Sequence, residues 1–210
     1  MKTTLTKTQL SQILVALFVG SLLISNVLAA KTFEVGSIVL PTAVIVFPVV
    51  YIVNDMLTEV YGFKKARNVI FLGFAINLFA VLSYAVAIAL PAPDYAKETA
   101  EAFTIALSST GRMLIASLSA YIIGSLANAY VMDKLKEKAE KHLMLRCVMS
   151  TLIGEGLDAI VFITIAFIGI IPLKALATMI LVQALFKTVF EIIVYPVTKT
   201  VINKAKAIAE

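Results

Sequence analysis

Six apolar stretches of about 20 residues recur along the chain, and they constrain its fold more than any other feature. A helix of about 20 residues crosses the roughly 30 Å hydrocarbon core of a bilayer. The stretches are Leu10–Ala30, Val35–Val53, Val69–Leu90, Met113–Met132, Cys147–Leu173 and Ala175–Thr198. The pattern predicts six transmembrane helices.

The composition favours an all-α integral membrane protein. Hydrophobic residues make up 60% of the 210 residues and charged residues 15%, whereas a soluble domain carries about 25% charged residues. The alternation of apolar and polar residues that marks a transmembrane β-strand is absent, which argues against a β-barrel. We expect a single transporter domain over residues 1–210, with a short surface helix at Lys97–Leu107 and a helical extension of the fourth span into residues 133–146.

Lysine and arginine gather at alternate ends of these spans. Short cytoplasmic loops of membrane proteins carry the excess of Lys and Arg. Thirteen basic residues lie at the N-terminus, after the second and fourth stretches, and at the C-terminus: Lys2, Lys7, Lys64, Lys65, Arg67, Lys134, Lys136, Lys138, Lys141, Arg146, Lys199, Lys204 and Lys206. Four lie on the other side: Lys31, Lys97, Arg112 and Lys174. This predicts that both termini are cytoplasmic, and it explains the net charge of +5 without a nucleic-acid partner.

The first stretch has some features of a secretory signal peptide. Lys2 and Lys7 precede an apolar run, and Val27-Leu28-Ala29 resembles a small-residue cleavage site. The run is long for a signal peptide, and its removal would leave five spans and put the basic loops on the wrong side. We therefore expect the first stretch to remain as a transmembrane helix.

Two acidic residues directly follow the second apolar stretch, at its predicted cytoplasmic end. Asp55 and Glu59 are four residues apart, so they share one face of a helix. Pro41 and Pro48 lie within the same predicted span, where we expect them to kink the helix. One interpretation of the carboxylates is gating or the binding of a coupling ion. The alternative is that they meet cytoplasmic water and pair with basic residues of the next loop: Lys64, Lys65 and Arg67.

The fifth stretch carries acidic residues close to the middle of the membrane. A charge there costs about 2.5–3.5 kcal/mol on insertion scales, so such residues usually face the interior of the bundle. Thr151, Glu155 and Asp158 share one face of the predicted helix. Gly154 and Gly156 beside them would allow another helix to approach closely. The pattern indicates a polar face directed into the bundle.

The sixth stretch has a matching polar stripe. Gln183, Lys187 and Glu191 follow one another at intervals of four residues and so lie on one face. One interpretation is a structural ion pair of Lys187 with Glu155 or with Glu191 that joins two helices. A pair alone would leave Asp158 and Gln183 without a role, so the two stripes favour a cavity lined with polar side chains.

Three segments together carry a resemblance to a known family. The most specific is Asp55-Met56-Leu57-Thr58-Glu59-Val60-Tyr61-Gly62, a long string of mixed chemistry. The others are Arg146–Asp158 and Lys187–Pro196, and Ser25-Asn26 fits as well. Over nearly its whole length the chain resembles the queuosine precursor transporter family, formerly called the vitamin uptake transporters.

The resemblance implies import of 7-cyano-7-deazaguanine, or of its 7-aminomethyl relative, for the queuosine modification of tRNA. The location would be the cytoplasmic (inner) membrane of a bacterium. The partners would be a purine-like small molecule and the lipid bilayer, with no nucleic acid and no cofactor. The small size of the chain is compatible with a homodimer.

Deazaguanine chemistry suits the polar residues of the predicted cavity. The ring N–H and the exocyclic amine lie side by side, and one carboxylate can accept hydrogen bonds from both. The carboxylate would be that of Glu155 or Asp158. The other candidates for substrate binding are Lys187, Gln183 and Asn26. The candidates for gating or ion coupling are Asp55, Glu59 and Glu191, and those for an aromatic contact with the ring are Tyr51, Phe162, Phe186 and Phe190.

Other functional classes fit less well. The alternative is a membrane subunit that captures a small heterocycle or vitamin and needs an ATPase partner, because the chain has no Walker-type phosphate loop of its own. An intramembrane enzyme is disfavoured because no Ser/His pair and no metal-ligand spacing is present. A channel is disfavoured because no loop resembles a selectivity filter. Cys147 is expected to act as a small buried apolar residue, and we expect neither catalysis nor a metal site.

Overall fold

The structure is a computed structural model that describes residues 6–35, 38–108, 111–138, 142–170 and 172–209. Within these ranges five helices are long and apolar enough to cross a membrane. They are α1 (Lys7–Leu28), α3 (Phe63–Ala89), α5 (Gly111–Lys138), α6 (Leu143–Phe167) and α7 (Leu173–Ala209). The short 3-10 helix η2 (Asp94–Ala96) and α4 (Lys97–Leu107) connect α3 to α5. The predicted helical membrane protein and the predicted surface helix are both confirmed.

The second apolar stretch is not one helix, and the prediction of a span over Val35–Val53 is wrong. Its first part belongs to the antiparallel strands β1 (Thr32–Val35) and β2 (Ile38–Pro41), followed by the 3-10 helix η1 (Thr42–Ile45). α2 (Phe47–Tyr61) comes next, with Pro48 in its first turn, where the missing N–H of proline costs no helical hydrogen bond. Pro41 is the last residue of β2. The prolines therefore mark the ends of elements instead of kinking one helix.

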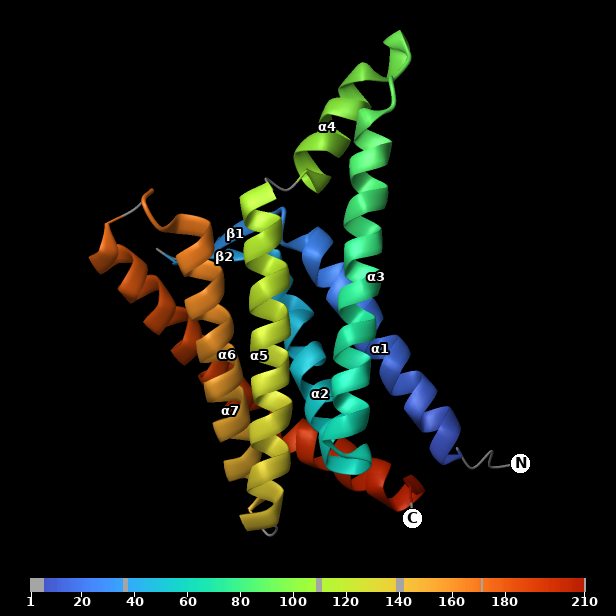
Figure 1. Cartoon of the computed structure of the whole chain (residues 1–210), viewed down its shortest axis with the longest axis vertical. Helices are drawn as coiled ribbons and strands as arrows, with labels where there is room; N and C mark the ends of the chain where they lie inside the picture. The colour runs from blue at the N-terminus through green and yellow to red at the C-terminus, as the bar shows by residue number, and fades with distance from the viewer. Residues whose placement is uncertain (1–5, 36–37, 109–110, 139–141, 171, 210) are drawn as a thin grey trace.

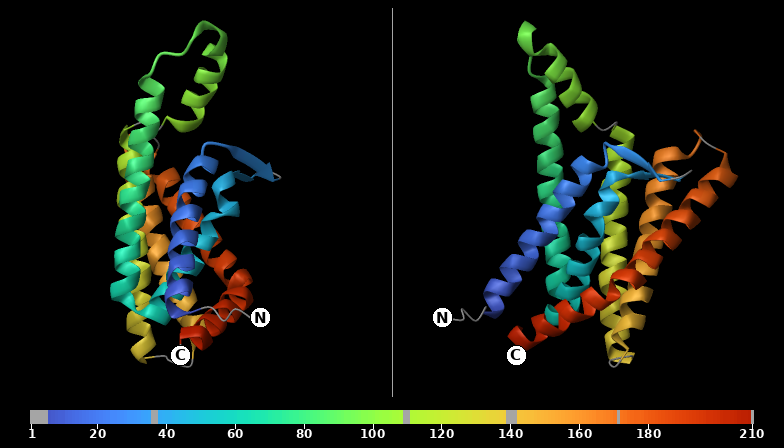
Figure 2. Two further views of the ribbon diagram at one scale, coloured as in Figure 1. Left: turned by 90° about the vertical axis from the view of Figure 1, so that its right-hand side faces the viewer. Right: turned by 180° about the vertical axis from the view of Figure 1, so that it is seen from behind.

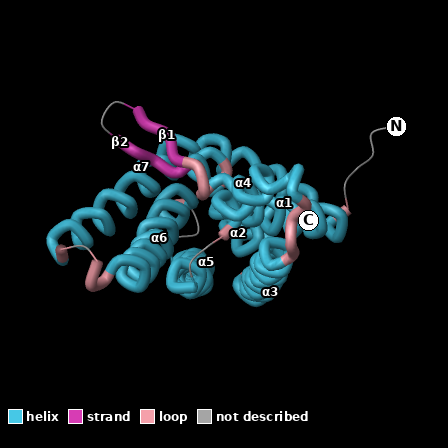
Figure 3. Tube along the Cα trace, turned by 90° about the horizontal axis from the view of Figure 1, so that it is seen from above, coloured by secondary structure: helices cyan, strands magenta, loops and turns pink. Residues whose placement is uncertain are grey.

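The helices form a bundle whose two ends differ (Figure 1). Seen from above, α3, α5 and α6 stand in a row, and α1, α2 and α7 lie behind it (Figure 3). α1 begins and α7 finishes at the same end of the bundle, which we call the terminal end (Figure 2). The turn between α2 and α3 is at this end as well, whereas α4 and the β1–β2 hairpin lie toward the opposite end (Figure 1).

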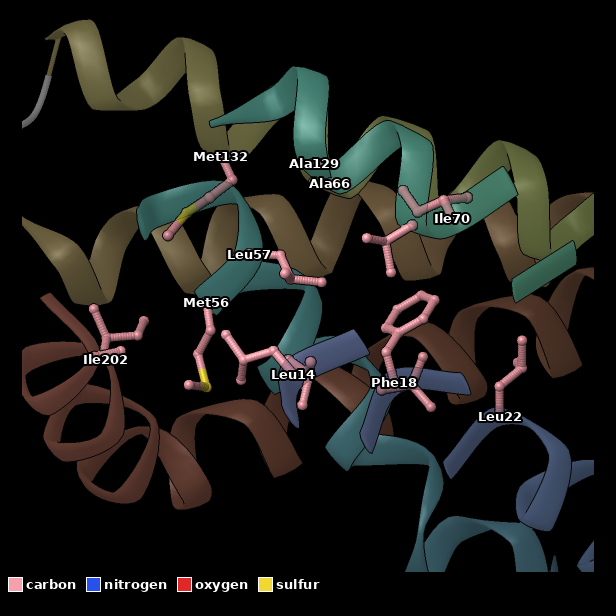
Figure 4. Close-up of a cluster of buried hydrophobic side chains, with 14 of the residues drawn as sticks. Leu14, Phe18, Leu22, Met56, Leu57, Ala66, Ile70, Ala129, Met132 and Ile202 are labelled. Carbon is pink, nitrogen blue, oxygen red and sulfur yellow. The ribbon is translucent and has the colours of Figure 1, made fainter. Parts of the chain in front are cut away.

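α2 is the central helix, because α1, α3, α5 and α7 all pack against it. Apolar side chains from these helices converge on it, as Figure 4 shows: Leu14, Phe18 and Leu22 from α1, Met56 and Leu57 from α2, Ile70 from α3, Met132 from α5 and Ile202 from α7. The polar residues of α2 share this environment, and every residue from Val53 to Glu59 is buried. Their polar groups must therefore find partners inside the protein.

α5 and α6 approach each other closely through glycine. A Cβ atom at Gly154 would lie 2.6 Å from the Cβ of Asn128 and 2.8 Å from the carbonyl oxygen of Gly124. A Cβ at Gly124 would lie 2.8 Å from the Cβ of Asp158. At Gly156 a Cβ would meet nothing within 4 Å. The close approach predicted for this glycine pair thus occurs at Gly154 and not at Gly156.

Replacement of Gly154 by alanine should destabilise the protein, while the same replacement at Gly156 should not. The overpacking at Gly154 is expected to cost about 1–3 kcal/mol. Alanine at Gly156 should be neutral or stabilising, because alanine favours the helix over glycine by about 1 kcal/mol. Thermal unfolding of both variants in one detergent measures the difference. Equal melting temperatures for the two variants would contradict the packing described here.

Candidate substrate-binding site

A cavity of about 310 Å³ lies among α1, α2, α3, α5, α6 and α7. Small-molecule sites usually have volumes of about 300–1,000 Å³, so the cavity suits a small ligand. The five residues predicted to bind substrate all line it: Asn26, Glu155, Asp158, Gln183 and Lys187. Glu191 lines it as well, whereas Asp55 and Glu59 lie outside it. The helical periodicity of α6 and α7 explains this arrangement, because it directs each polar stripe to one side.

Lys187 joins the two polar stripes on the cavity wall. Its ammonium group donates hydrogen bonds to Oε2 of Glu155 and, over 3.2 Å, to Oδ2 of Asp158. Nζ of Lys187 also lies 4.9 Å from the centroid of the Phe47 ring, which is a cation–π contact. The predicted ion pair of Lys187 with Glu155 is therefore present. Lys187 forms a second ion pair with Asp158, and not the alternative pair with Glu191. Two carboxylates share one ammonium group, so oxygen atoms remain that can accept hydrogen bonds from a ligand.

Aromatic and apolar side chains form much of the remaining wall. The four residues predicted for contact with a ring all line the cavity: Tyr51, Phe162, Phe186 and Phe190. The structure adds Phe47 and Tyr121, which were not predicted site residues. Phe47 is the first residue of α2. Its place at the cavity depends on the break before α2, which the apolar pattern gave no reason to expect.

An amide pair adds to the polar groups of the cavity. Nδ2 of Asn26 on α1 donates a hydrogen bond to Oδ1 of Asn77 on α3 over 2.8 Å. Asn77 lines the cavity but was not a predicted site residue. In the sequence, Asn77 is a single amide within a long apolar stretch. Such a residue is as typical of a hydrogen bond between two helices as of a binding site.

Glu59 is the centre of a buried ion cluster at the terminal end. Arg146 of α6 donates two hydrogen bonds to its carboxylate, over 2.5 and 3.0 Å, and Lys206 of α7 donates to the same carboxylate. Lys136 of α5 donates to the main-chain carbonyl of Glu59 over 2.6 Å. The side chains of Glu59 and Arg146 are 1% and 2% exposed. We call this group the Glu59 ion cluster, and it ties α2 to α5, α6 and α7.

The Glu59 ion cluster overturns one of the interpretations of this face of α2. That interpretation placed both carboxylates in water, paired with the loop residues Lys64, Lys65 and Arg67, which are in fact exposed. It is wrong because α2 is enclosed by other helices, so Asp55 and Glu59 are buried. The partners of Glu59 come instead from helices that are distant in the sequence.

A second polar group lies one turn earlier on α2. Asp55 is fully buried, and ligand atoms of Asp55, Cys147 and Glu191 all lie within 4.8 Å of one another. The expected burial of Cys147 is confirmed. The sequence alone does not predict this grouping, because its members belong to α2, α6 and α7 and only the packing of the three helices brings them together.

Comparison with known proteins assigns the chain to a family. Residues 41–201 match the model of the family described as "Putative vitamin uptake transporter". A "Probable queuosine precursor transporter" of Bacillus subtilis (strain 168) is 26% identical over 151 residues, which cover 70% of this chain and 65% of that relative. No solved structure matches the chain. The family match begins before α2 and reaches into α7, and so includes most of the cavity wall. The chain therefore belongs to this family of transporters and is a multi-pass protein of a bacterial membrane.

Proposed function

We propose that the chain imports a deazaguanine precursor of queuosine, 7-cyano-7-deazaguanine or its 7-aminomethyl relative, through the cavity described above. The observation that carries this proposal is the cluster of Glu155, Lys187 and Asp158 in an otherwise largely aromatic and apolar cavity. Binding sites for small molecules are mostly apolar and fix their ligand through a few convergent polar groups. A flat heterocycle with hydrogen-bond donors along one edge fits such a wall.

Each polar group of the substrate has a suitable partner on the wall. The two adjacent N–H groups of the guanine-like edge match the two oxygen atoms of one carboxylate, that of Glu155 or Asp158. The carbonyl oxygen and the nitrile accept hydrogen bonds, which Lys187, Gln183 and Asn26 can donate. Lys187 also offsets part of the acidic charge, which makes it easier to hold two carboxylates in a membrane.

The same proposal includes six membrane passes with both termini in the cytoplasm. α2 runs opposite to α1 and α3 (Figure 1), which supports a sixth crossing by this 15-residue helix. Exposed basic residues gather at the terminal end after α2 and at the end of α5: Lys64, Lys65, Arg67 and Lys134. Basic loops favour the cytoplasmic side. The Glu59 ion cluster would then close the cytoplasmic end of the transporter.

The import proposal predicts restored queuosine in a tester strain. The strain is a bacterium that cannot synthesise the precursor and lacks its own importer, and it receives nanomolar 7-cyano-7-deazaguanine. Expression of this protein should restore queuosine in tRNA, measured by chromatography of digested tRNA, and an empty vector should not. Absence of queuosine, with the protein shown to be in the membrane, would contradict the proposal.

Transport by the purified protein separates an autonomous importer from a substrate-capture subunit. Proteoliposomes that contain this protein alone should take up labelled 7-cyano-7-deazaguanine. Uptake in cells together with binding but no uptake in proteoliposomes would instead indicate that an ATPase partner is required.

The Phe47 ring should contribute to affinity for the heterocycle. Stacking of a base on an aromatic side chain contributes about 1–3 kcal/mol, so Phe47→Leu should weaken binding of 7-cyano-7-deazaguanine by about tenfold. Phe79→Leu is the matched control, because Phe79 on α3 is 72% exposed and does not line the cavity. Equilibrium binding of labelled ligand to both purified variants tests this, and equal affinities would exclude a role for the Phe47 ring.

A further inference from the structure

A second polar layer lies directly beneath the cavity on three helices. α2 places Tyr51 on the cavity wall and Asp55 one turn further along. α7 places Lys187 on the wall and Glu191 one turn further along, also lining the cavity. α6, which runs the opposite way, has Cys147 one turn before the wall residue Thr151. All three steps lead toward the terminal end. Asp55, Cys147 and Glu191 therefore form a layer next to the cavity, which we call the floor; of the three, Glu191 also lines the cavity.

The two carboxylates of this floor are buried, and among the described residues no lysine or arginine forms a salt bridge with either of them. Asp55 is 0% and Glu191 4% exposed. Neither oxygen of Asp55, nor Oε1 of Glu191, accepts a well-formed hydrogen bond from the described residues. Two carboxylates this close together in a buried site do not both carry a negative charge, because each disfavours the ionised form of the other.

The surrounding groups do not supply the missing charge. The titratable groups that interact with the pair are Glu59 on α2 and Cys147 on α6. Two cations are close by: Arg146 on α6, which interacts with Cys147, and Lys187, one turn before Glu191 on α7. In the described part of the chain, Lys187 pairs with Glu155 and Asp158, and Arg146 pairs with Glu59. The two cations nearest in sequence are therefore engaged by other carboxylates.

Asn128 of α5 is an independent indication of what the floor binds. It is fully buried, and its Nδ2 atom has no well-formed hydrogen bond among the described residues. Nδ2 of Asn54 donates to Oδ1 of Asn128 over 2.7 Å, so Oδ1 is occupied and the donor Nδ2 is the group that remains toward Asp55. The other neighbour of Asp55 is the thiol of Cys147, also a donor. Donors stabilise the ionised form of a carboxyl, so Asn128 and Cys147 suit a pair that holds a single proton, with Asp55 as the ionised member and Glu191 as the protonated one.

We propose that Asp55 and Glu191 form a proton-binding carboxyl pair that couples transport to the proton gradient, an inference that rests on the proposed import function. A proton enters through the cavity, forms an O–H bond with one carboxyl oxygen of the pair, and leaves toward the terminal end in each transport cycle. The position explains the coupling: on α2 the cavity residue Tyr51, the pair member Asp55 and the ion-cluster centre Glu59 lie at successive turns. Protonation of the pair thus changes the charge of the layer that lies between the substrate cavity and the Glu59 ion cluster.

The protonated pair is testable without substrate. Infrared spectra of the purified protein at neutral pH should show absorption of a protonated carboxyl that is absent in the double variant Asp55→Asn/Glu191→Gln and retained in Cys147→Ala. Identical spectra for wild type and the double variant would overturn the proposal. Loss of the signal in Cys147→Ala would overturn it as well, because the thiol would then be essential to the site. Size-exclusion chromatography confirms that each variant is folded.

The coupling is tested in proteoliposomes loaded with an alkaline interior. A gradient of one pH unit should support about tenfold accumulation of labelled 7-cyano-7-deazaguanine if one proton accompanies each substrate. The Asp55→Asn variant should bind substrate but show no accumulation. Accumulation driven by a Na⁺ gradient and not by pH would overturn the proposal. Absence of any substrate binding by the wild type would refute the proposed import function, while the infrared result would still decide whether the pair is protonated.

Discussion

Uptake of 7-cyano-7-deazaguanine should collapse when the carboxylates of the cavity are neutralised. Hydrogen bonds to a charged group contribute about 1.5–3 kcal/mol each, so loss of a bidentate contact should lower substrate affinity by about 100-fold or more. Glu155→Gln and Asp158→Asn keep the size of the side chains and remove the charge. The variant with the larger loss identifies the carboxylate that reads the guanine-like edge, and the double variant should show no measurable uptake.

Two measurements separate this effect from a general loss of structure. Binding of labelled substrate to purified protein reports affinity, and size-exclusion chromatography reports folding. Glu98→Gln is the matched control, because Glu98 lies in the first turn of α4 and is exposed. Full uptake and unchanged affinity in both Glu155→Gln and Asp158→Asn would exclude these residues from substrate recognition.

Removal of the Glu59 carboxylate should cause the largest loss of stability of any single substitution at the terminal end. Breaking a buried ion pair by removing one partner costs about 3–5 kcal/mol. Glu59→Leu removes the group that Arg146 and Lys206 share and leaves the buried Arg146 cation without that carboxylate. The variant should show a markedly lower melting temperature in detergent and reduced abundance in the membrane.

A second substitution shows whether the charge is responsible. Replacement of both partners of a buried pair by apolar residues is often neutral, so Glu59→Leu/Arg146→Leu should recover most of the stability lost in Glu59→Leu. Lys64→Leu serves as the control for a basic residue of the terminal end, because Lys64 is exposed. A melting temperature of Glu59→Leu equal to that of the wild type would show that the cluster adds nothing to stability.

Helical periodicity explains why much of the cavity could be predicted from the sequence. A charge inside a membrane is costly wherever it faces lipid, so Glu155, Asp158 and Lys187 had to face the interior. Spacing of three or four residues then fixed which side chains share a face. The chain needed no long-range information for this part of the site, and the structure places all five predicted substrate-binding residues on one cavity. Their role in binding stays a prediction.

The parts that the sequence did not reveal depend on contacts between distant segments. The break before α2 arises where a hairpin replaces the start of an apolar stretch, and an apolar stretch alone does not distinguish a strand from a helix. The partners of Glu59 and the grouping of Asp55 with Cys147 and Glu191 depend on how the helices rotate against one another. No periodicity within a single helix contains that information.

The long separation between Glu59 and its partners has a consequence for how the protein is made. Arg146 and Lys206 follow Glu59 by 87 and 147 residues, so α2 leaves the ribosome well before either of them. Each unpaired charge that enters the bilayer core costs about 2.5–3.5 kcal/mol. In the six-pass arrangement proposed above, α2 would therefore gain little from entering the lipid by itself and would reach its final depth only when α6 and α7 have been synthesised. Biogenesis would then end with the insertion of the central helix, and a nascent chain released before α7 would expose α2 to membrane quality control.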